Sequence, residues 1–288
     1  MLGYEVIVLD VQERRYGALP SGVHFISGNL SMSYLLREAL LGVDVVFHLA
    51  WATIHEVSNR DPAGDVTTNL LPTLELLETC KLSDVQKVVF ASSGGTVYGP
   101  AQSLPIPEDH PLCPVNSYGI TKLAVEKYLE MYRHLYGLEY AALRPSVPYG
   151  PRQNPLARQG AVPVFLYRVA RGLPIDIWGD GSVTRDFFYV TDLVEAFIKV
   201  AFRKQPTEHR VFNVGGGREI SLLQLVRLVE ETVGRKAEVD FQAARPFDAP
   251  RVLLDTRLAE DELDWRPTVS LQEGLARTWH WMSQELSM

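Results

Sequence analysis

Residues 43–50 read VDVVFHLA, a nearly continuous apolar run that is typical of a strand buried on both faces of a parallel sheet. Runs of similar texture occur at residues 5–10, 86–92 and 139–144. Stretches with helical periodicity alternate with these strands, at residues 30–41, 65–80 and 117–136. Strands that alternate with helices indicate an α/β fold with a doubly wound parallel sheet, which binds its ligands at the carboxyl ends of its strands.

The texture of the chain changes after Gly150. Glycine and proline interrupt residues 151–185, and the elements that follow are short. We therefore expect a first domain over residues 1–150, to which residues 187–202 return. A smaller α+β lobe should follow over residues 151–288.

Composition excludes several classes of protein. The 288 residues are 46% hydrophobic and 22% charged, as in ordinary globular proteins. A net charge of −7 argues against nucleic-acid binding. The two cysteines, Cys80 and Cys113, form neither a metal-binding spacing nor a disulfide framework, which fits the reducing cytoplasm. The apolar run at residues 6–9 ends at Asp10 and predicts neither a signal peptide nor a membrane span.

The hexapeptide SYGITK at residues 117–122 places Tyr118 and Lys122 four residues apart at the start of a predicted helix. Residues at this spacing share one helix face. Because an ammonium favours a neighbouring phenolate, we expect Lys122 to lower the pKa of Tyr118 from its ordinary value near ~10. Such a pair can act in proton transfer, although the same spacing also occurs on ordinary surface helices.

Three motifs occur in a fixed order: SSGGTVYG at residues 92–99, SYGITK at 117–122 and RPSVPYG at 144–150. Together they resemble the extended short-chain dehydrogenase/reductase family, and within it the NAD-dependent nucleotide-sugar epimerases of the UDP-glucose or UDP-N-acetylglucosamine 4-epimerase type. The resemblance implies a Rossmann-like NAD domain, a lobe that binds a nucleotide sugar, and inversion at C4 by transient oxidation. It also implies a homodimer that forms through the helices at residues 65–80 and 117–136.

The resemblance assigns cofactor contacts along the first domain. Asp10 would bind the adenosine ribose, Asn29 the adenine, and the other contacts would be Leu49, Ala50, Trp51 and Asn69. In this family a first strand and a glycine-rich loop precede the ribose-binding acid. Only nine residues precede Asp10. We therefore expect the chain to lack the first βα unit, either because its start is shortened or because it is a catalytically silent relative.

The resemblance also assigns the chemistry. Tyr118 would be the base, Lys122 would hold the nicotinamide ribose as well, and the hydroxyl of Ser93 would polarise the sugar oxygen. Gly94 stands where the family usually has serine or threonine. Residues 94–96 carry no carboxylate, which disfavours a dehydratase. A 4-keto-sugar reductase of the same family stays an alternative, which net consumption of cofactor would reveal.

For the nucleotide sugar, the resemblance points to the later part of the chain. Valine replaces the usual asparagine at Val147, so one expected bond to the substrate diphosphate is missing. The arginines suit a diphosphate because the guanidinium fork can bind phosphate oxygens in pairs. The expected substrate-binding residues are Gln159, Trp178, Arg185, Arg245 and Asp248.

Overall fold

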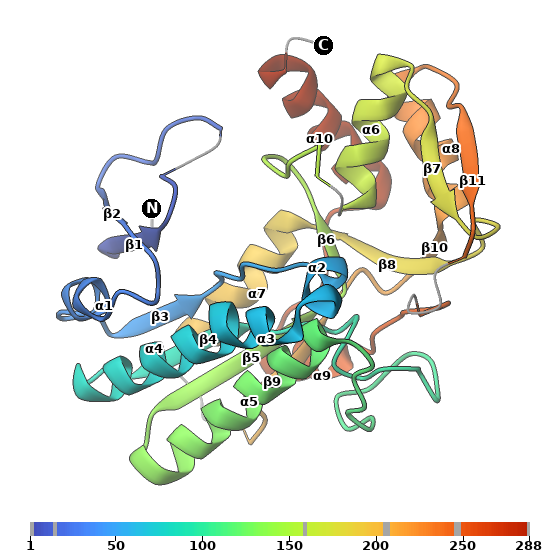
Figure 1. Cartoon of the computed structure of the whole chain (residues 1–288). Helices are drawn as coiled ribbons and strands as arrows, with labels where there is room; N and C mark the ends of the chain where they lie inside the picture. Colours follow the sequence, from blue (N-terminus) through green and yellow to red (C-terminus); the bar gives the residue numbers. More distant parts are fainter. Residues whose placement is uncertain (1–2, 14–15, 158–159, 204–207, 245–248, 287–288) are drawn as a thin grey trace. The chain divides into compact units, whose positions relative to one another are not determined.

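The computed structural model describes residues 3–13, 16–157, 160–203, 208–244 and 249–286 (Figure 1). The chain forms two compact units. The first unit consists of Met1–Ser92 and Asn116–Ala142, and the second of Ser93–Val115 and Leu143–Met288. The predicted domain boundary at residue 150, with the return of residues 187–202, stays a prediction.

The strands of the first unit are parallel, as predicted. Strand β1 (Val6–Asp10) pairs with β2 (Val23–Ser27), and β3 (Val45–His48) pairs with β4 (Lys87–Ala91). Strand β5 (Glu139–Pro145), most of which belongs to this unit, follows β4 in the sheet order. The middle of β4 is fully buried, which explains its continuous apolar sequence.

From β2 onward, helices alternate with the strands of the first unit (Figure 1). Helix α1 spans Ser33–Ala39 and α2 spans His55–Arg60. Helix α5 (Ser117–Tyr136) has the bounds predicted from the sequence. Asn116 caps its start by accepting the backbone N–H of Gly119 at 2.8 Å, and Gly137 ends it at a φ of 75°.

The helix predicted over residues 65–80 is divided into three pieces. They are α3 (Pro62–Asp65), a π-helical turn η1 (Val66–Leu70) and α4 (Leu71–Leu82). Pro72 lies in the first turn of α4 and has no N–H to donate, so the regular hydrogen-bond pattern is interrupted there. Single π turns are frequent at functional sites.

The second unit contains shorter sheets. Strand β8 (Thr184–Tyr189) lies between β6 (Val147–Tyr149) and β10 (Glu219–Ser221), and β7 (Ile175–Trp178) pairs with β11 (Val239–Gln242). The remaining elements are α6 (Ala161–Arg171), α7 (Val190–Phe202), β9 (Val211–Val214), α8 (Leu222–Val233), α9 (Arg257–Leu263) and α10 (Leu271–Glu285). No helix among the described residues is long and apolar enough to cross a membrane.

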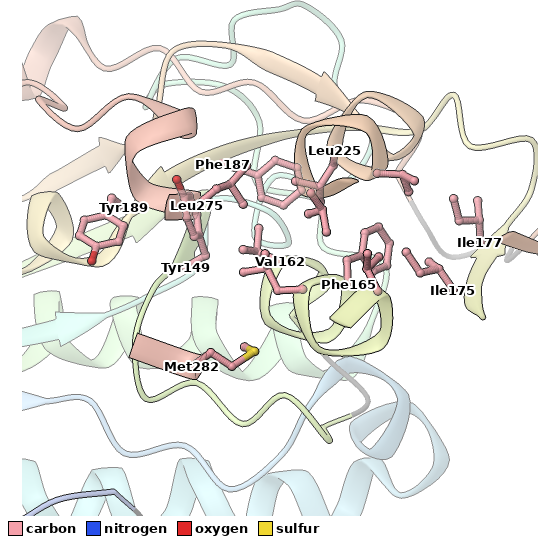
Figure 2. Close-up of a cluster of buried hydrophobic side chains, with 14 residues drawn as sticks. Tyr149, Val162, Phe165, Ile175, Ile177, Phe187, Tyr189, Leu225, Leu275 and Met282 are labelled. Carbon is pink, nitrogen blue, oxygen red and sulfur yellow. The ribbon is translucent and has the colours of Figure 1, made fainter. Parts of the chain in front are cut away.

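A buried apolar cluster joins α6, α8 and α10 to the strands of the second unit (Figure 2). Phe165 and Leu225 pack in this cluster, and Tyr149 contacts Tyr189 edge to face at 5.8 Å. A buried carboxylate fastens the C-terminal region to α7. Asp192 accepts the hydroxyl of Thr268 at 2.8 Å and the backbone N–H of the next residue at 3.2 Å.

Candidate active site

The first turns of α5 bring Tyr118 and Lys122 together, as the SYGITK spacing predicts. Lys122 is almost completely buried, and its Nζ donates to the backbone carbonyl of Ala91 at 2.6 Å. The same Nζ lies 3.7 Å from the ring centre of Trp51, 4.7 Å from that of Phe90 and 5.6 Å from that of Tyr118. The ammonium is therefore held between a carbonyl and aromatic faces, which attract a cation.

The electrostatics of the pair differ from the sequence prediction. Burial lowers the pKa of Lys122 to about 7, against the opposing charges of Asp65 and Glu126. Burial, and secondly the Asp65 carboxylate, raise the pKa of Tyr118 to about 12. The prediction that the pKa of Tyr118 is lowered is thus wrong for this structure. The sequence spacing showed the proximity of the lysine but not the desolvation that acts on both groups.

His48, at the end of β3, is a buried and uncharged side chain next to this site. Thr73 donates its hydroxyl hydrogen to the carbonyl of Asn69 at 2.6 Å, so its oxygen accepts from His48 Nε2 at 2.9 Å. Burial, followed by the charge of Lys122, lowers the pKa of His48 to about 3. Its ring stacks on Phe90 with centres 5.4 Å apart. The histidine is therefore uncharged at neutral pH and adds no competing cation.

Asn69, which the resemblance assigns to the cofactor site, holds the segment that follows β3. Its Oδ1 accepts the backbone N–H of Ala52 at 2.7 Å. Its Nδ2 donates to the hydroxyl of Thr53 and to the carboxylate of Asp65, each at 2.9 Å. The buried amide thus fixes the backbone beside Trp51, which is consistent with a position next to the cofactor.

The other predicted cofactor residues lie at the carboxyl ends of parallel strands. Asp10 ends β1 with an exposed carboxylate, and its carbonyl accepts the N–H of Gly28, next to Asn29. Leu49 and Ala50 follow β3 and are exposed. Ligands of doubly wound sheets bind at such strand ends. The assignment of these four residues to the cofactor stays a prediction.

The predicted hydroxyl loop belongs to the second unit. Ser93 is half-buried, and its carbonyl accepts the N–H of Val97 at 3.2 Å. Gly94 has no room for a side chain, since a Cβ would lie 2.4 Å from Leu254 and 2.9 Å from the carbonyl of Arg144. Serine or threonine, usual in the family, would not fit there without a shift. The buried hydroxyl of Thr96 in the same loop has no hydrogen-bond partner among the described residues.

Two predicted substrate residues are described in the second unit. Trp178 ends β7 and is 37% exposed. Arg185, in β8, donates to the carbonyls of Thr184 at 2.8 Å and Ala249 at 2.7 Å, which fixes its guanidinium group. Three predicted residues lie outside the described part of the chain: Gln159, Arg245 and Asp248.

Sequence reasoning missed two buried residues next to the pair. Asp65 is completely buried and accepts hydrogen bonds from Ser117 and Thr121, and the buried His48 is affected by the charge of Lys122. A signal was present for Asp65, because it precedes Asn69 by four residues and shares its helix face. From the sequence, His48 was interpreted only as part of a buried strand.

The described residues fit the NAD that the resemblance implies. The exposed carboxylate of Asp10 can accept ribose hydroxyls, and carboxylates at this strand end select the ribose without a 2′-phosphate. The indole Nε1 of Trp51 is buried and has no hydrogen-bond partner among the described residues, so a donor is available beside Lys122. The first unit thus offers polar groups for NAD at the carboxyl ends of its parallel strands.

Comparisons with known proteins identify the family of this chain. The model of the family "NAD dependent epimerase/dehydratase family" matches residues 1–215. A UDP-glucose 4-epimerase of Mycolicibacterium smegmatis is 40% identical over 235 residues, which cover 82% of this chain and 74% of the relative. The structure of UDP-glucose 4-epimerase with UDP-glucose from Thermotoga maritima has a TM-score of 0.92 and 36% identity, over 99% of this chain and 92% of that chain. The Thermus thermophilus UDP-glucose 4-epimerase in complex with NAD has a TM-score of 0.88 and 34% identity, over 97% and 91% of the two chains.

One expectation is not supported by these findings. We expected a missing first βα unit, but the family model matches from residue 1 and the Thermotoga maritima structure covers 99% of this chain. In the structure the first strand, β1, is already paired in parallel with β2. The prediction rested on counting the residues before Asp10, which does not determine how strands pair. The chain belongs to the NAD dependent epimerase/dehydratase family, as a nucleotide-sugar epimerase family enzyme with NAD as its cofactor.

Proposed function

We propose that this protein interconverts the C4 epimers of a UDP-hexose, with Tyr118 as the base. The observation that carries the proposal is the buried Lys122 ammonium beside the Tyr118 ring on α5, held by Ala91 and Trp51. This arrangement supports proton transfer at one substrate hydroxyl. The relatives named above act on UDP-glucose, which makes UDP-glucose and UDP-galactose the first pair to test.

The residues of the chain have separate roles in this proposal. Tyr118 removes the proton from the sugar 4-hydroxyl and returns it after C4 has changed its configuration. Ser93 donates a hydrogen bond to the same sugar oxygen as charge develops there. Bound NAD supplies the oxidation and reduction at C4 and a positive charge beside the tyrosine. The positive charge of bound NAD would lower the pKa of Tyr118 from the high value it has in the buried site, and Lys122 would hold the nicotinamide ribose, as the resemblance implies.

In our proposal, the substrate diphosphate is bound by the second unit. Arg185 is fixed by two backbone carbonyls, so little entropy is lost when its guanidinium binds a phosphate. Val147, in β6, cannot donate the hydrogen bond that asparagine gives in the family. We therefore expect binding of the diphosphate to depend on the arginines, with Arg245 and Asp248 contributing as the resemblance implies.

We also propose a homodimer that forms through α4 and α5, which pack against each other within one chain. Apolar side chains remain exposed on both helices, as expected where a partner covers them. They are Leu71, Leu82, Ile120, Met131, Leu135 and Tyr136. Light scattering should give about twice the chain mass of 32.3 kDa. A mass of one chain at micromolar concentration would refute the dimer.

The function is tested by incubating the purified protein with NAD and UDP-glucose and resolving the sugars by anion-exchange chromatography. We expect UDP-galactose to form until an equilibrium is reached, with no net reduction of NAD. Stoichiometric accumulation of reduced cofactor would instead identify a dehydrogenase, and consumption of reduced cofactor with a 4-keto sugar would identify a 4-keto-sugar reductase. If UDP-glucose is inert, UDP-N-acetylglucosamine and UDP-glucuronate are the next substrates, and failure of all three would refute the proposal.

A further inference from the structure

Asp65, the last residue of α3, is a buried carboxylate that the proposed reaction does not use directly. Its side chain is completely inaccessible to solvent. Four neutral groups donate to its two oxygens, as expected for a buried charge that is stabilised by hydrogen bonds. Oδ1 accepts from Thr53 and from Asn69 at 2.9 Å, and Oδ2 accepts from Ser117 and from Thr121, both at 2.9 Å.

The two donors on α5 lie next to the Tyr118–Lys122 pair in sequence. Ser117 and Thr121 directly precede Tyr118 and Lys122, and they are also four residues apart. One carboxylate oxygen therefore binds two successive turns of α5. These bonds fix how the helix is rotated about its axis, and that rotation sets the direction of the phenol and the ammonium. The other oxygen accepts hydrogen bonds from Thr53 and Asn69. Thr53 belongs to the segment that follows Trp51, and Asn69 binds the backbone of that segment at Ala52. The ring of Trp51 faces the ammonium.

The charge of Asp65 also acts on the pair. Among the residues that the structure describes, the titratable groups around Lys122 are Asp65 from α3, Tyr118 and Glu126 from α5, and His48 from β3. His48 is neutral at the pH of interest, and Glu126 accepts a hydrogen bond from Ser92. Asp65 raises the pKa of both Lys122 and Tyr118, whereas Glu126 acts on Lys122. The carboxylate thus opposes the loss of the lysine proton that burial favours.

We propose that Asp65 is a positioning residue for the Tyr118–Lys122 pair. Its carboxylate fixes the first two turns of α5 and provides the negative charge that retains the lysine as an ammonium. This inference rests on the function proposed above for the pair. Asp65 acts through its hydrogen bonds to Ser117 and Thr121 and through the field of its charge.

The charge is tested directly by nuclear magnetic resonance, without substrate. Protein labelled with ¹³C at lysine Cε is titrated, and the Lys122 signal is the one absent from Lys122→Met. In Asp65→Asn we expect the Lys122 midpoint to fall by about one pH unit, as removal of a nearby opposite charge predicts. The matched control is Asp61→Asn, which changes an exposed acid four residues earlier and should leave the midpoint unchanged. An unchanged midpoint in Asp65→Asn would overturn the electrostatic part of the proposal.

Turnover provides the second readout. We expect Asp65→Asn to lower kcat at least tenfold while KM stays within threefold, and to move the pH profile of kcat towards acid. A merely structural role would lower the melting temperature without moving the pH profile, and that result would overturn the proposal.

If Asp65→Asn does not fold, Thr121→Val removes one donor and keeps the charge. Thr121→Val should lower kcat and leave the titration midpoint of Lys122 unchanged. If this variant turns over substrate as fast as the wild-type protein, the positioning role is refuted. Absence of epimerase activity in the wild-type protein would refute the proposed function instead, and the lysine titration would still decide the role of the Asp65 charge.

Discussion

Replacement of Lys122 by methionine should stabilise the protein at pH 6 while it removes activity. Lys122 is almost completely buried, and burial lowers its pKa from 10.5 to about 7. The folded chain therefore holds this proton less well than the unfolded chain does. Methionine has a similar length and no charge, and Asp65 and Glu126 keep their own hydrogen bonds in the variant.

The magnitude follows from proton linkage. At pH 6 both states are mostly protonated, so the full difference in pKa costs the wild-type fold about 5 kcal/mol, at 1.36 kcal/mol per pKa unit. Methionine removes this cost but leaves the carbonyl of Ala91 without its donor, and the contact with Trp51 is lost. These losses cost about 3 kcal/mol together. The variant should therefore be more stable by about 2 kcal/mol at pH 6.

The free energy of unfolding changes with pH in the opposite direction to that expected for a lysine whose pKa is raised by a stabilising ion pair. Between the two pKa values the unfolded chain binds more protons, so wild-type stability rises with pH. At pH 9 only about 2 kcal/mol of the cost remains, so the advantage of the variant should disappear.

Urea unfolding followed by circular dichroism at pH 6 and pH 9 measures this change, with Lys127→Met on the exposed face of the same helix as the control. The reasoning is refuted if the difference between variant and wild type is the same at both pH values.

Three further predictions concern single residues. Tyr118→Phe should abolish epimerisation while calorimetry shows nearly unchanged binding of UDP-glucose, and equal loss of both would make Tyr118 structural. Cys113 is exposed, whereas burial raises the pKa of Cys80 to about 12, so the native protein should react with one equivalent of a thiol reagent at pH 8 and with two in denaturant. Asp192→Ala leaves two donors without a partner and should lower the free energy of unfolding by about 3 kcal/mol. Glu195→Ala on the same helix should change it by less than about 0.5 kcal/mol, and similar values for the two variants would contradict the anchor role of Asp192.

Much of the first unit could be predicted because its signals are local. The apolar runs become β3, β4 and β5, and Asn116 and Gly137 set the ends of α5. The helix predicted over residues 65–80 was less accurate, since a proline and a π turn divide it. Periodicity does not distinguish a regular helix from one with a single wide turn.

The site was only partly predictable, for a different reason. The spacing of Tyr118 and Lys122 fixes their common face, but their pKa values depend on burial by segments that are distant in sequence. Asp65 lies 52 residues before Ser117, to which it bonds, and a single sequence gives no sign of that contact. The order of motifs identified the family, whereas the count of residues before Asp10 led to the expectation of a missing unit.

The central claim is that one active site removes the hydrogen at C4 and returns it to the other face of the same sugar, with Tyr118 as the base. UDP-glucose that carries deuterium at C4, incubated with the protein in ordinary water, tests this most directly. The account predicts UDP-galactose that retains deuterium at C4, and no such product with Tyr118→Phe. Product with hydrogen from water at C4, or full retention of turnover in Tyr118→Phe, would contradict it.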